Sequence, residues 1–376
     1  MNIFSGATIR GLLKALVSFS CLSLTGSISF LCFGLAKGPA VRADDSTGAA
    51  GTIQSLSEKS EPRSSRRESA HPFRPFPRKW SRLTSAATTF ETGSQQGKGH
   101  RFACADFSQG RIFIVSPEGA VEWEYRAPSC NDLWVLANGN LLFNTGHGVQ
   151  EVTRAKQVVF SYESKSEIYA CQRLANGNTF IGECNAGRLL EVAPDGRLVK
   201  QVRLLPEGQD GGHLYMRNAR VLADGHYLVA HYGQQVVREY DADGKAVAEF
   251  SAPGGPHSTA RLPNGHTLIA CGDSTPGANK FIEVDRAGKV VWSLGAEELP
   301  GVSLKFMTGF HRLPNGNTVL SNWLGHGHLG KAPHLIEVTP DKRVVWTFAD
   351  HQTMKTISSV QVLDVPGDVM KGEVWH

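Results

Sequence analysis

Apolar and polar residues alternate in short runs from residue 101 onward, and glycine turns interrupt these runs at intervals. The clearest copies are Arg261–Ala270 and Arg312–Ser321, which read RLPNGHTLIA and RLPNGNTVLS. Alternation with a period of two indicates strands, and Asn-Gly or Asp-Gly between two such runs favours a two-residue hairpin turn. Weaker copies bring the turn glycines to five, at residues 139, 177, 225, 265 and 316, spaced 38, 48, 40 and 51 apart.

A second alternating pair follows each turn, as in Ile282–Trp292 and Leu335–Trp346, so each unit predicts four short antiparallel strands. Such a unit is typical of a β-propeller blade. Five complete units start near residues 131, 168, 216, 256 and 307. Phe102–Tyr125 supplies the last three strands of another, and Ile357–Asp364 supplies its first. The sequence therefore predicts an all-β, six-bladed β-propeller of four-stranded antiparallel blades, closed by the C-terminal strand joining the first blade.

The unit containing Leu262–Leu268 and Glu283–Trp292 resembles the repeats of PQQ-like and arylsulfotransferase-like bacterial propellers, and of exported propeller proteins in planctomycete bacteria. The resemblance covers residues 101–376 and rests on turn and packing positions, so it implies the fold more than the chemistry. Quinone-dependent dehydrogenases of this group are longer, and many carry a vicinal cysteine pair that this chain lacks, so PQQ is not expected. Arylsulfotransferases use a histidine nucleophile with neighbouring His and Arg, and carry a sandwich domain that has no counterpart here.

The N-terminal 100 residues have a different pattern. Arg10 and Lys14 precede the uncharged stretch Ala15–Ala36, and Val41-Arg42-Ala43 provides small residues at the −3 and −1 positions of a cleavage site. Residues 1–43 are therefore predicted to be a signal peptide, with an uncleaved membrane anchor as the alternative. Residues 44–100, rich in Ser, Arg and Pro, are predicted to be a disordered linker, and residues 101–376 the propeller. We expect export to the periplasm or the extracellular space.

Charge and cysteine content narrow the classes further. The formal charge of +4 comes from four basic residues of the N-terminal segment, and the part from residue 101 is three charges negative. A nucleic-acid partner is not expected, because phosphate binding needs a clustered basic surface. We expect a monomer. The mature chain keeps an odd number of cysteines, which leaves buried free thiols or one or two disulfides as alternatives: Cys104, Cys130, Cys171, Cys184 and Cys271.

A ligand site is expected at one end of the ring. The first strand of each unit starts, and the second strand ends, at the same end of a blade. Polar residues at this end differ from blade to blade, as a recognition site on a repetitive scaffold should, although hydration of a central channel is the alternative. The predicted funnel residues are Asp106, Asp132, Glu183, Arg217, Asn218, His231, His257 and Asn322. Further ligand contacts are expected from His147, His213, Trp134 and Trp323.

Three chemistries fit this funnel, and the cofactor is left open. A Ca²⁺-like cation would take the oxygens of Asp106, Asp132, Glu183 and Asn322, as in the similar sugar-lactonase-like propellers. An arylsulfotransferase-like transfer or a lactonase- or lyase-like reaction would use His257 or His231, with Arg217 holding an anionic substrate group. Binding of a small molecule, glycan or peptide without turnover needs only the polar ring, and is the function we expect first.

Overall fold

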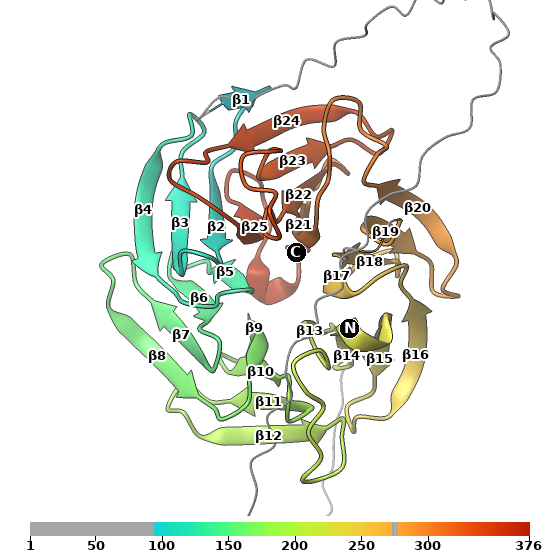
Figure 1. The fold of residues 1–376 in the computed structure, drawn as a ribbon. Coiled ribbons are helices and arrows are strands. Elements are labelled where there is room, and N and C mark those ends of the chain that lie inside the picture. Colours follow the sequence, from blue (N-terminus) through green and yellow to red (C-terminus); the bar gives the residue numbers. More distant parts are fainter. Residues whose placement is uncertain (1–93, 273–274, 276) are drawn as a thin grey trace, which may run out of the picture. The chain divides into compact units, whose positions relative to one another are not determined.

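The computed structural model describes residues 94–272, 275 and 277–376. The predictions for residues 1–43 and for 44–93 lie outside the described residues. Six antiparallel sheets are arranged in a ring around a central channel (Figure 1), which confirms the predicted six-bladed propeller. Within the described part of the chain, no helix combines the length and apolarity needed to cross a membrane.

Short strands alternate with tight turns, as the period-two pattern predicted. The strands are β1 Ser94–Gln96, β2 Phe102–Asp106, β3 Arg111–Val115, β4 Val121–Arg126, β5 Leu133–Val135, β6 Leu141–Asn144, β7 Gly148–Val152, β8 Val158–Glu163, β9 Ile168–Arg173, β10 Thr179–Glu183, β11 Arg188–Val192, β12 Leu198–Arg203, β13 Asn218–Val221, β14 Tyr227–His231, β15 Val236–Tyr240, β16 Ala246–Ser251, β17 Pro256–Arg261, β18 Thr267–Cys271, β19 Lys280–Val284, β20 Val290–Gly295, β21 Met307–Arg312, β22 Thr318–Asn322, β23 Leu335–Val338, β24 Val344–Ala349 and β25 Ile357–Val362. Two short 3-10 helices, η1 Tyr232–Gln234 and η2 Val369–Lys371, complete the described elements.

The ring closes as predicted, with one addition. Strand β25 pairs with β2, Cys104 opposite Val360, and so provides the innermost strand of the first blade. Strand β1 pairs with the outermost strand of the sixth blade, β24, with Gln95 opposite Phe348. The linker was predicted to extend to residue 100, but residues 94–96 at its end form this strand. The pairing of β1 uses main-chain groups, which leave no mark in the side-chain pattern.

In the second to sixth blades, the turn between the first two strands is longer than the predicted two-residue hairpin. The Gly139 N–H donates to Leu136 O at 2.8 Å, and the Leu136 N–H donates to Asn140 O at 2.8 Å. Only Gly139 has a positive φ, 81°, and Asn138 does not. This is a three-residue loop in which a type I turn is followed by a left-handed glycine, an arrangement that also matches the twist of a hairpin.

Ion pairs join neighbouring blades. The third strand of each blade contains a register shift, and in five blades a glutamate lies directly at this shift, as Glu283 does in β19. Glu283 accepts from His266 of its own blade at 2.7 Å and from Arg312 of the next blade at 3.1 Å. The same contact between blades recurs as Glu151–Arg173 and Glu239–Arg261.

The core lies between adjacent blades. Phe281 and Phe310, from the fifth and sixth blades, pack with ring centroids 4.9 Å apart. Trp346 is 1% exposed and packs against Phe102 of the first blade, so it serves packing between blades. The structure also decides between the cysteine alternatives. All five described cysteines are reduced, buried thiols: Cys104, Cys130, Cys171, Cys184 and Cys271.

Candidate functional site

Two polar residues of the predicted funnel hold loops in place. Asp106, at the end of β2, is fully buried, and its carboxylate accepts from the main-chain N–H of Lys355 at 2.7 Å and of Thr356 at 3.2 Å. Asn322, at the end of β22, is also fully buried and accepts from the Lys305 N–H at 2.6 Å. Both side chains satisfy main-chain groups of the loops that enter the first strands.

Glu183 and His231 are likewise engaged inside the ring wall. Glu183, fully buried, pairs with Arg188 of the adjacent strand β11. The His231 imidazole lies 3.0 Å from Tyr215 O and 2.8 Å from the Tyr240 hydroxyl, and none of it is exposed. Burial lowers the pKa of His231 to about 4. The His231 imidazole is enclosed and neutral, so a substrate in the channel cannot contact it in this structure.

Asp132 reaches across the channel instead of facing a ligand. Its carboxylate forms a two-point ion pair with Arg220 at 2.8 and 2.9 Å, and accepts from the Cys171 N–H at 2.9 Å. The Asn218 amide, with its oxygen oriented toward Arg220, accepts from both guanidinium nitrogens at 3.2 Å. The Trp134 ring lies under the same guanidinium at 4.9 Å and is 2% exposed. These residues tie the innermost strands of the second, third and fourth blades together.

The predicted calcium ligands do not converge. Asp106, Asp132, Glu183 and Asn322 each have the separate partners given above. Within the described ranges, the only three His, Cys, Asp or Glu side chains whose ligand atoms lie within 4.8 Å of one another are Asp224, His226 and Glu239. This trio belongs to the ion pairs between blades, because Glu239 also binds Arg261 at 2.6 Å. A guanidinium in contact with the carboxylate disfavours a cation there.

Arg217 and His257, in contrast, both contact Tyr232 at the predicted end of the ring. The Arg217 guanidinium lies 4.4 Å from the ring centre of Tyr169 and 5.3 Å from that of Tyr232. Its Nε is buried and has no hydrogen-bond partner. Tyr232 in turn packs edge-on against His257, with centroids 4.8 Å apart. Burial raises the pKa of Tyr169 to about 12, so its hydroxyl stays protonated.

The aromatic contacts continue from His257 into the sixth blade. His257 packs against Phe306 at 5.2 Å, and Phe306 packs against Trp323 at 5.4 Å and His326 at 5.6 Å. A Cβ on Gly325 would lie 2.0 Å from the Trp323 ring, so this ring rests flat on the main chain. We call the set the aromatic arc: Tyr169, Arg217, Tyr232, His257, Phe306 and Trp323. All six lie at the start of a first strand or the end of a second strand, in the third to sixth blades.

Two predicted histidines lie in loops at the same end. His213 is exposed, and its Nδ1 lies 2.7 Å from the Glu167 carboxylate and 3.5 Å from the Tyr169 hydroxyl. His213 therefore extends the arc as a histidine oriented by a carboxylate. His147 is exposed, and its Nδ1 lies 3.1 Å from Ser166 O, which places it beside the loop that precedes Glu167.

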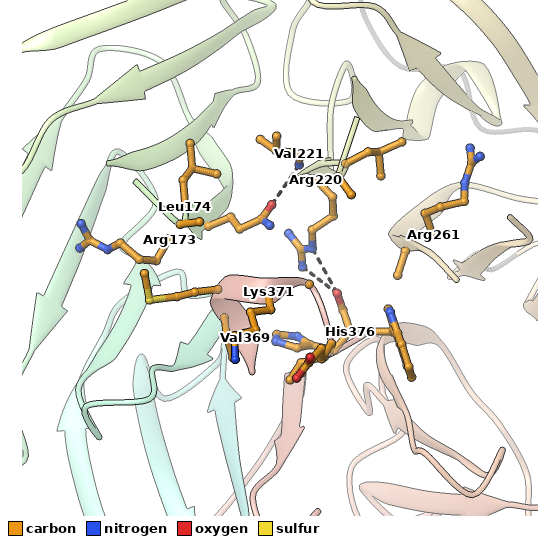
Figure 2. Close-up of a pocket in the computed structure, with 18 of the residues that line it drawn as sticks. Arg173, Leu174, Arg220, Val221, Arg261, Val369, Lys371 and His376 are labelled. Carbon is orange, nitrogen blue, oxygen red and sulfur yellow. Dashed lines mark hydrogen bonds between the residues drawn. The ribbon is translucent and has the colours of Figure 1, made fainter. Parts of the chain in front are cut away.

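A cavity lies at the opposite end of the channel, where the sequence repeats Leu-Pro-Asn-Gly (Figure 2). It measures about 780 Å³ and lies between the inner strands of the third to fifth blades and residues 369–376, which fold back into the channel. Arg220 donates to His376 O at 3.0 Å on its floor. Arg173 and Arg261 line it, but their guanidinium groups are paired with Glu151 and Glu239. These two cations of its wall are therefore already neutralised, whereas no described carboxylate forms an ion pair with Arg286, which also lines the cavity.

No protein-family profile matches the chain, and no curated protein matches it. The solved structures that are similar include a protein of unknown function from Bacteroides caccae, 25% identical, covering 70% of this chain and 98% of that chain with a TM-score of 0.63. A streptogramin B lyase is 12% identical, covering 69% and 88%, with a TM-score of 0.48. A functionally unknown protein from Desulfotomaculum acetoxidans is 12% identical, covering 71% and 100%, with a TM-score of 0.46. The similarity to the Bacteroides caccae protein supports the fold, and the ring of six sheets defines the class, a six-bladed β-propeller. Membership of a PQQ-like or arylsulfotransferase-like family stays an expectation.

Proposed function

We propose that this protein is an exported ligand-binding module, with its ligand site at the aromatic arc. The observation that carries the proposal is the position of Arg217 between two tyrosine rings, at the end of the channel where the first strands begin. The packing residues of the wall repeat from blade to blade, whereas the residues that form the arc differ between the blades that contribute them. Partly exposed aromatic rings around one cation are suited to holding a small molecule, a glycan or a peptide.

Trp323 provides the test of the binding site. The protein is titrated with neutral sugars, acidic sugars, short peptides and aromatic acids, and the melting temperature and tryptophan fluorescence are recorded. We expect a ligand that raises the melting temperature and changes the fluorescence, with both effects lost in Trp323→Ala. The matched control is Trp292→Ala, because Trp292 lies in the outermost strand β20 and donates to Pro340 O at 2.7 Å. A ligand that binds Trp323→Ala as tightly as the wild type contradicts the proposed site.

Export is the second part of the proposal, and the pattern of residues 1–43 supports it. Fusing residues 1–43 to a phosphatase that is active only in an oxidising compartment tests it directly. We expect activity from this fusion and none from a control fusion in which Arg10 and Lys14 are changed to Glu, because a positively charged start is part of the signal. Equal activity from both fusions would argue against a signal in this segment.

An enzyme in the same place is the alternative, and the pair His213–Glu167 favours it. The Glu167 carboxylate, 2.7 Å from Nδ1 of His213, orients the imidazole, as the partner of a general base does. His257, beside Tyr232 in the arc, is the other candidate base, and Arg217 would hold an anionic substrate group. Turnover of aryl sulfates or lactones that is lost in His213→Gln or His257→Gln would support this alternative. The control is His226→Gln, which removes a His–Glu pair of 2.8 Å at the opposite end of the ring.

A further inference from the structure

We infer that the ligand of the aromatic arc is an aromatic carboxylate: a planar ring with one carboxylate group, which pairs with Arg217 while the ring packs along the arc. This inference rests on the proposed binding function and names its ligand class. The carboxylate would supply a counter-charge that no described residue gives Arg217 in an ion pair, and the ring would complete a row of aromatic contacts.

The first argument is the contrast among arginines at the innermost strands. Four of these arginines form an ion pair with a carboxylate of the ring, whereas no described carboxylate forms an ion pair with Arg217. The four pairs are Arg173–Glu151, Arg220–Asp132, Arg261–Glu239 and Arg312–Glu283. The channel therefore provides a carboxylate for its structural arginines and leaves Arg217 for another partner.

The second argument is the cost of leaving Arg217 in this state. Its side chain is half-buried and its Nε is removed from water without a hydrogen bond. A guanidinium that has lost water gains most from a charged acceptor, and its planar fork matches a carboxylate with two parallel hydrogen bonds. The rings of Tyr169 and Tyr232 hold the plane of this fork, which lowers the entropy lost on binding.

The third argument concerns the rest of the ligand. The contacts run from Tyr232 through His257 and Phe306 to Trp323, and neighbouring ring centroids are 4.8, 5.2 and 5.4 Å apart. Ring faces arranged in this way attract another planar ring by offset or edge-to-face packing. The arc contains a single arginine, so the ligand needs only one anionic group. In the cavity at the other end of the channel, the inner arginines Arg173, Arg220 and Arg261 are already paired with carboxylates of the ring.

The experiment compares three probes on the full chain by isothermal titration calorimetry. The probes are 2-naphthoate, its neutral amide 2-naphthamide, and acetate, which has the carboxylate without the ring. We expect 2-naphthoate to bind at least about tenfold more tightly than either of the others, the factor that one charge-assisted hydrogen bond provides. This comparison needs no variant, so a variant that fails to fold does not affect it.

Variants then locate the interaction. Arg217→Gln should remove the preference for 2-naphthoate over 2-naphthamide, and Arg217→Lys should weaken naphthoate binding about tenfold because the planar fork is lost. The matched control is Arg154→Gln, since Arg154 lies over the Trp123 ring at 5.2 Å in the turn between β7 and β8. Its affinity for 2-naphthoate should equal that of the wild type.

Several results would overturn the inference. Equal binding of 2-naphthamide would show that charge is not recognised, and equal binding of acetate would show that the ring is not. Undetectable binding of 2-naphthoate, or unchanged binding in Arg217→Gln, would exclude this ligand class at the arc. The proposed binding function would survive these results if a sugar or peptide still bound in a way that depends on Trp323.

Discussion

Arg217 and Arg220 lie three residues apart and have opposite roles. Arg220 points into the channel, is 5% exposed, and forms a two-point ion pair with Asp132. Arg217 precedes the strand β13, stays half-buried at the channel mouth, and contacts tyrosine rings. The two arginines therefore differ through their position along the chain: Arg220 lies where Asp132 reaches it across the channel, whereas no described carboxylate forms an ion pair with Arg217 at the channel mouth.

At the same scale, burial of His231 predicts a dependence of stability on pH. Its pKa in the folded protein is about 4, below the ordinary value of 6.5, so the unfolded chain binds the proton first. Its contribution to stability is complete above pH 6.5 and is lost as the pH falls toward 4. The loss amounts to about 2 kcal/mol between pH 7.5 and pH 5.

Urea unfolding at the two pH values checks this prediction. His231→Phe should be less stable at both values, because the contacts to Tyr215 and Tyr240 are lost, but it should show a smaller decrease on acidification. His147→Gln, at an exposed histidine, serves as the control and should keep the wild-type decrease. The same decrease in His231→Phe and the wild type would contradict the assigned protonation.

At the scale of elements, three of the six blades are joined to the next by a described glutamate–arginine ion pair at the register shift of the third strand. The shift bends the strand, and the glutamate beside it reaches an arginine at the end of the next first strand, as Glu283 reaches Arg312. Both side chains of this pair are mostly buried, with exposed fractions of 13% and 14%. Because its two residues come from different blades, the pair stabilises the interface between the blades.

A double-mutant cycle measures the coupling within this pair. Glu283→Gln and Arg312→Met should each lower the free energy of unfolding by about 1–3 kcal/mol, and the two together by clearly less than the sum, because each single change leaves a buried partner unpaired. The comparison pair is Asp341–Arg343, whose side chains are 62% and 72% exposed, and there the coupling should be below about 0.5 kcal/mol. Equal coupling in both cycles would argue against a role of burial.

Closure by β25 gives a second prediction for an element. All six residues of Ile357–Val362 are buried, and the strand provides the innermost position of the first blade. A chain ending at Thr356 should lose the cooperative thermal transition in far-UV circular dichroism. A chain ending at Leu363 keeps β25 and serves as the control, which should melt cooperatively at a lower temperature than the full chain. A sharp transition in the shorter chain would contradict closure by this strand.

At the scale of the whole molecule, we expect contacts between neighbouring blades to make the ring unfold as one cooperative unit. The clusters of buried side chains combine residues from adjacent blades, and the cluster of Phe102, Trp346 and Val360 joins the two ends of the described ring. A ring closed in this way has no terminal blade from which unfolding can start.

The five buried thiols report on this cooperativity. Burial raises the pKa of Cys104 and of Cys184, so both are protonated and unreactive in the folded ring. We expect no alkylation of Cys104, Cys184 or Cys271 in native protein, and alkylation of all three at the same urea concentration. Mass spectrometry of peptides labelled at each concentration measures this. Separate midpoints for the three would show that blades unfold independently.

The sequence by itself determined the number of blades, the strand order and the closing strand, because alternation and glycine turns are local properties repeated along the chain. It also placed Arg217, His257 and Trp323 at one end of the ring, where the aromatic arc lies. Only the tertiary structure decided which polar residues meet. Asp132 and Arg220 are 88 residues apart in the chain yet form an ion pair across the channel, and Tyr232 and Phe306 entered the arc without a sequence signal of their own. Whether a buried polar group pairs with another residue or remains available to a ligand depends on distances across the ring. These distances are fixed only when the blades have closed into the ring.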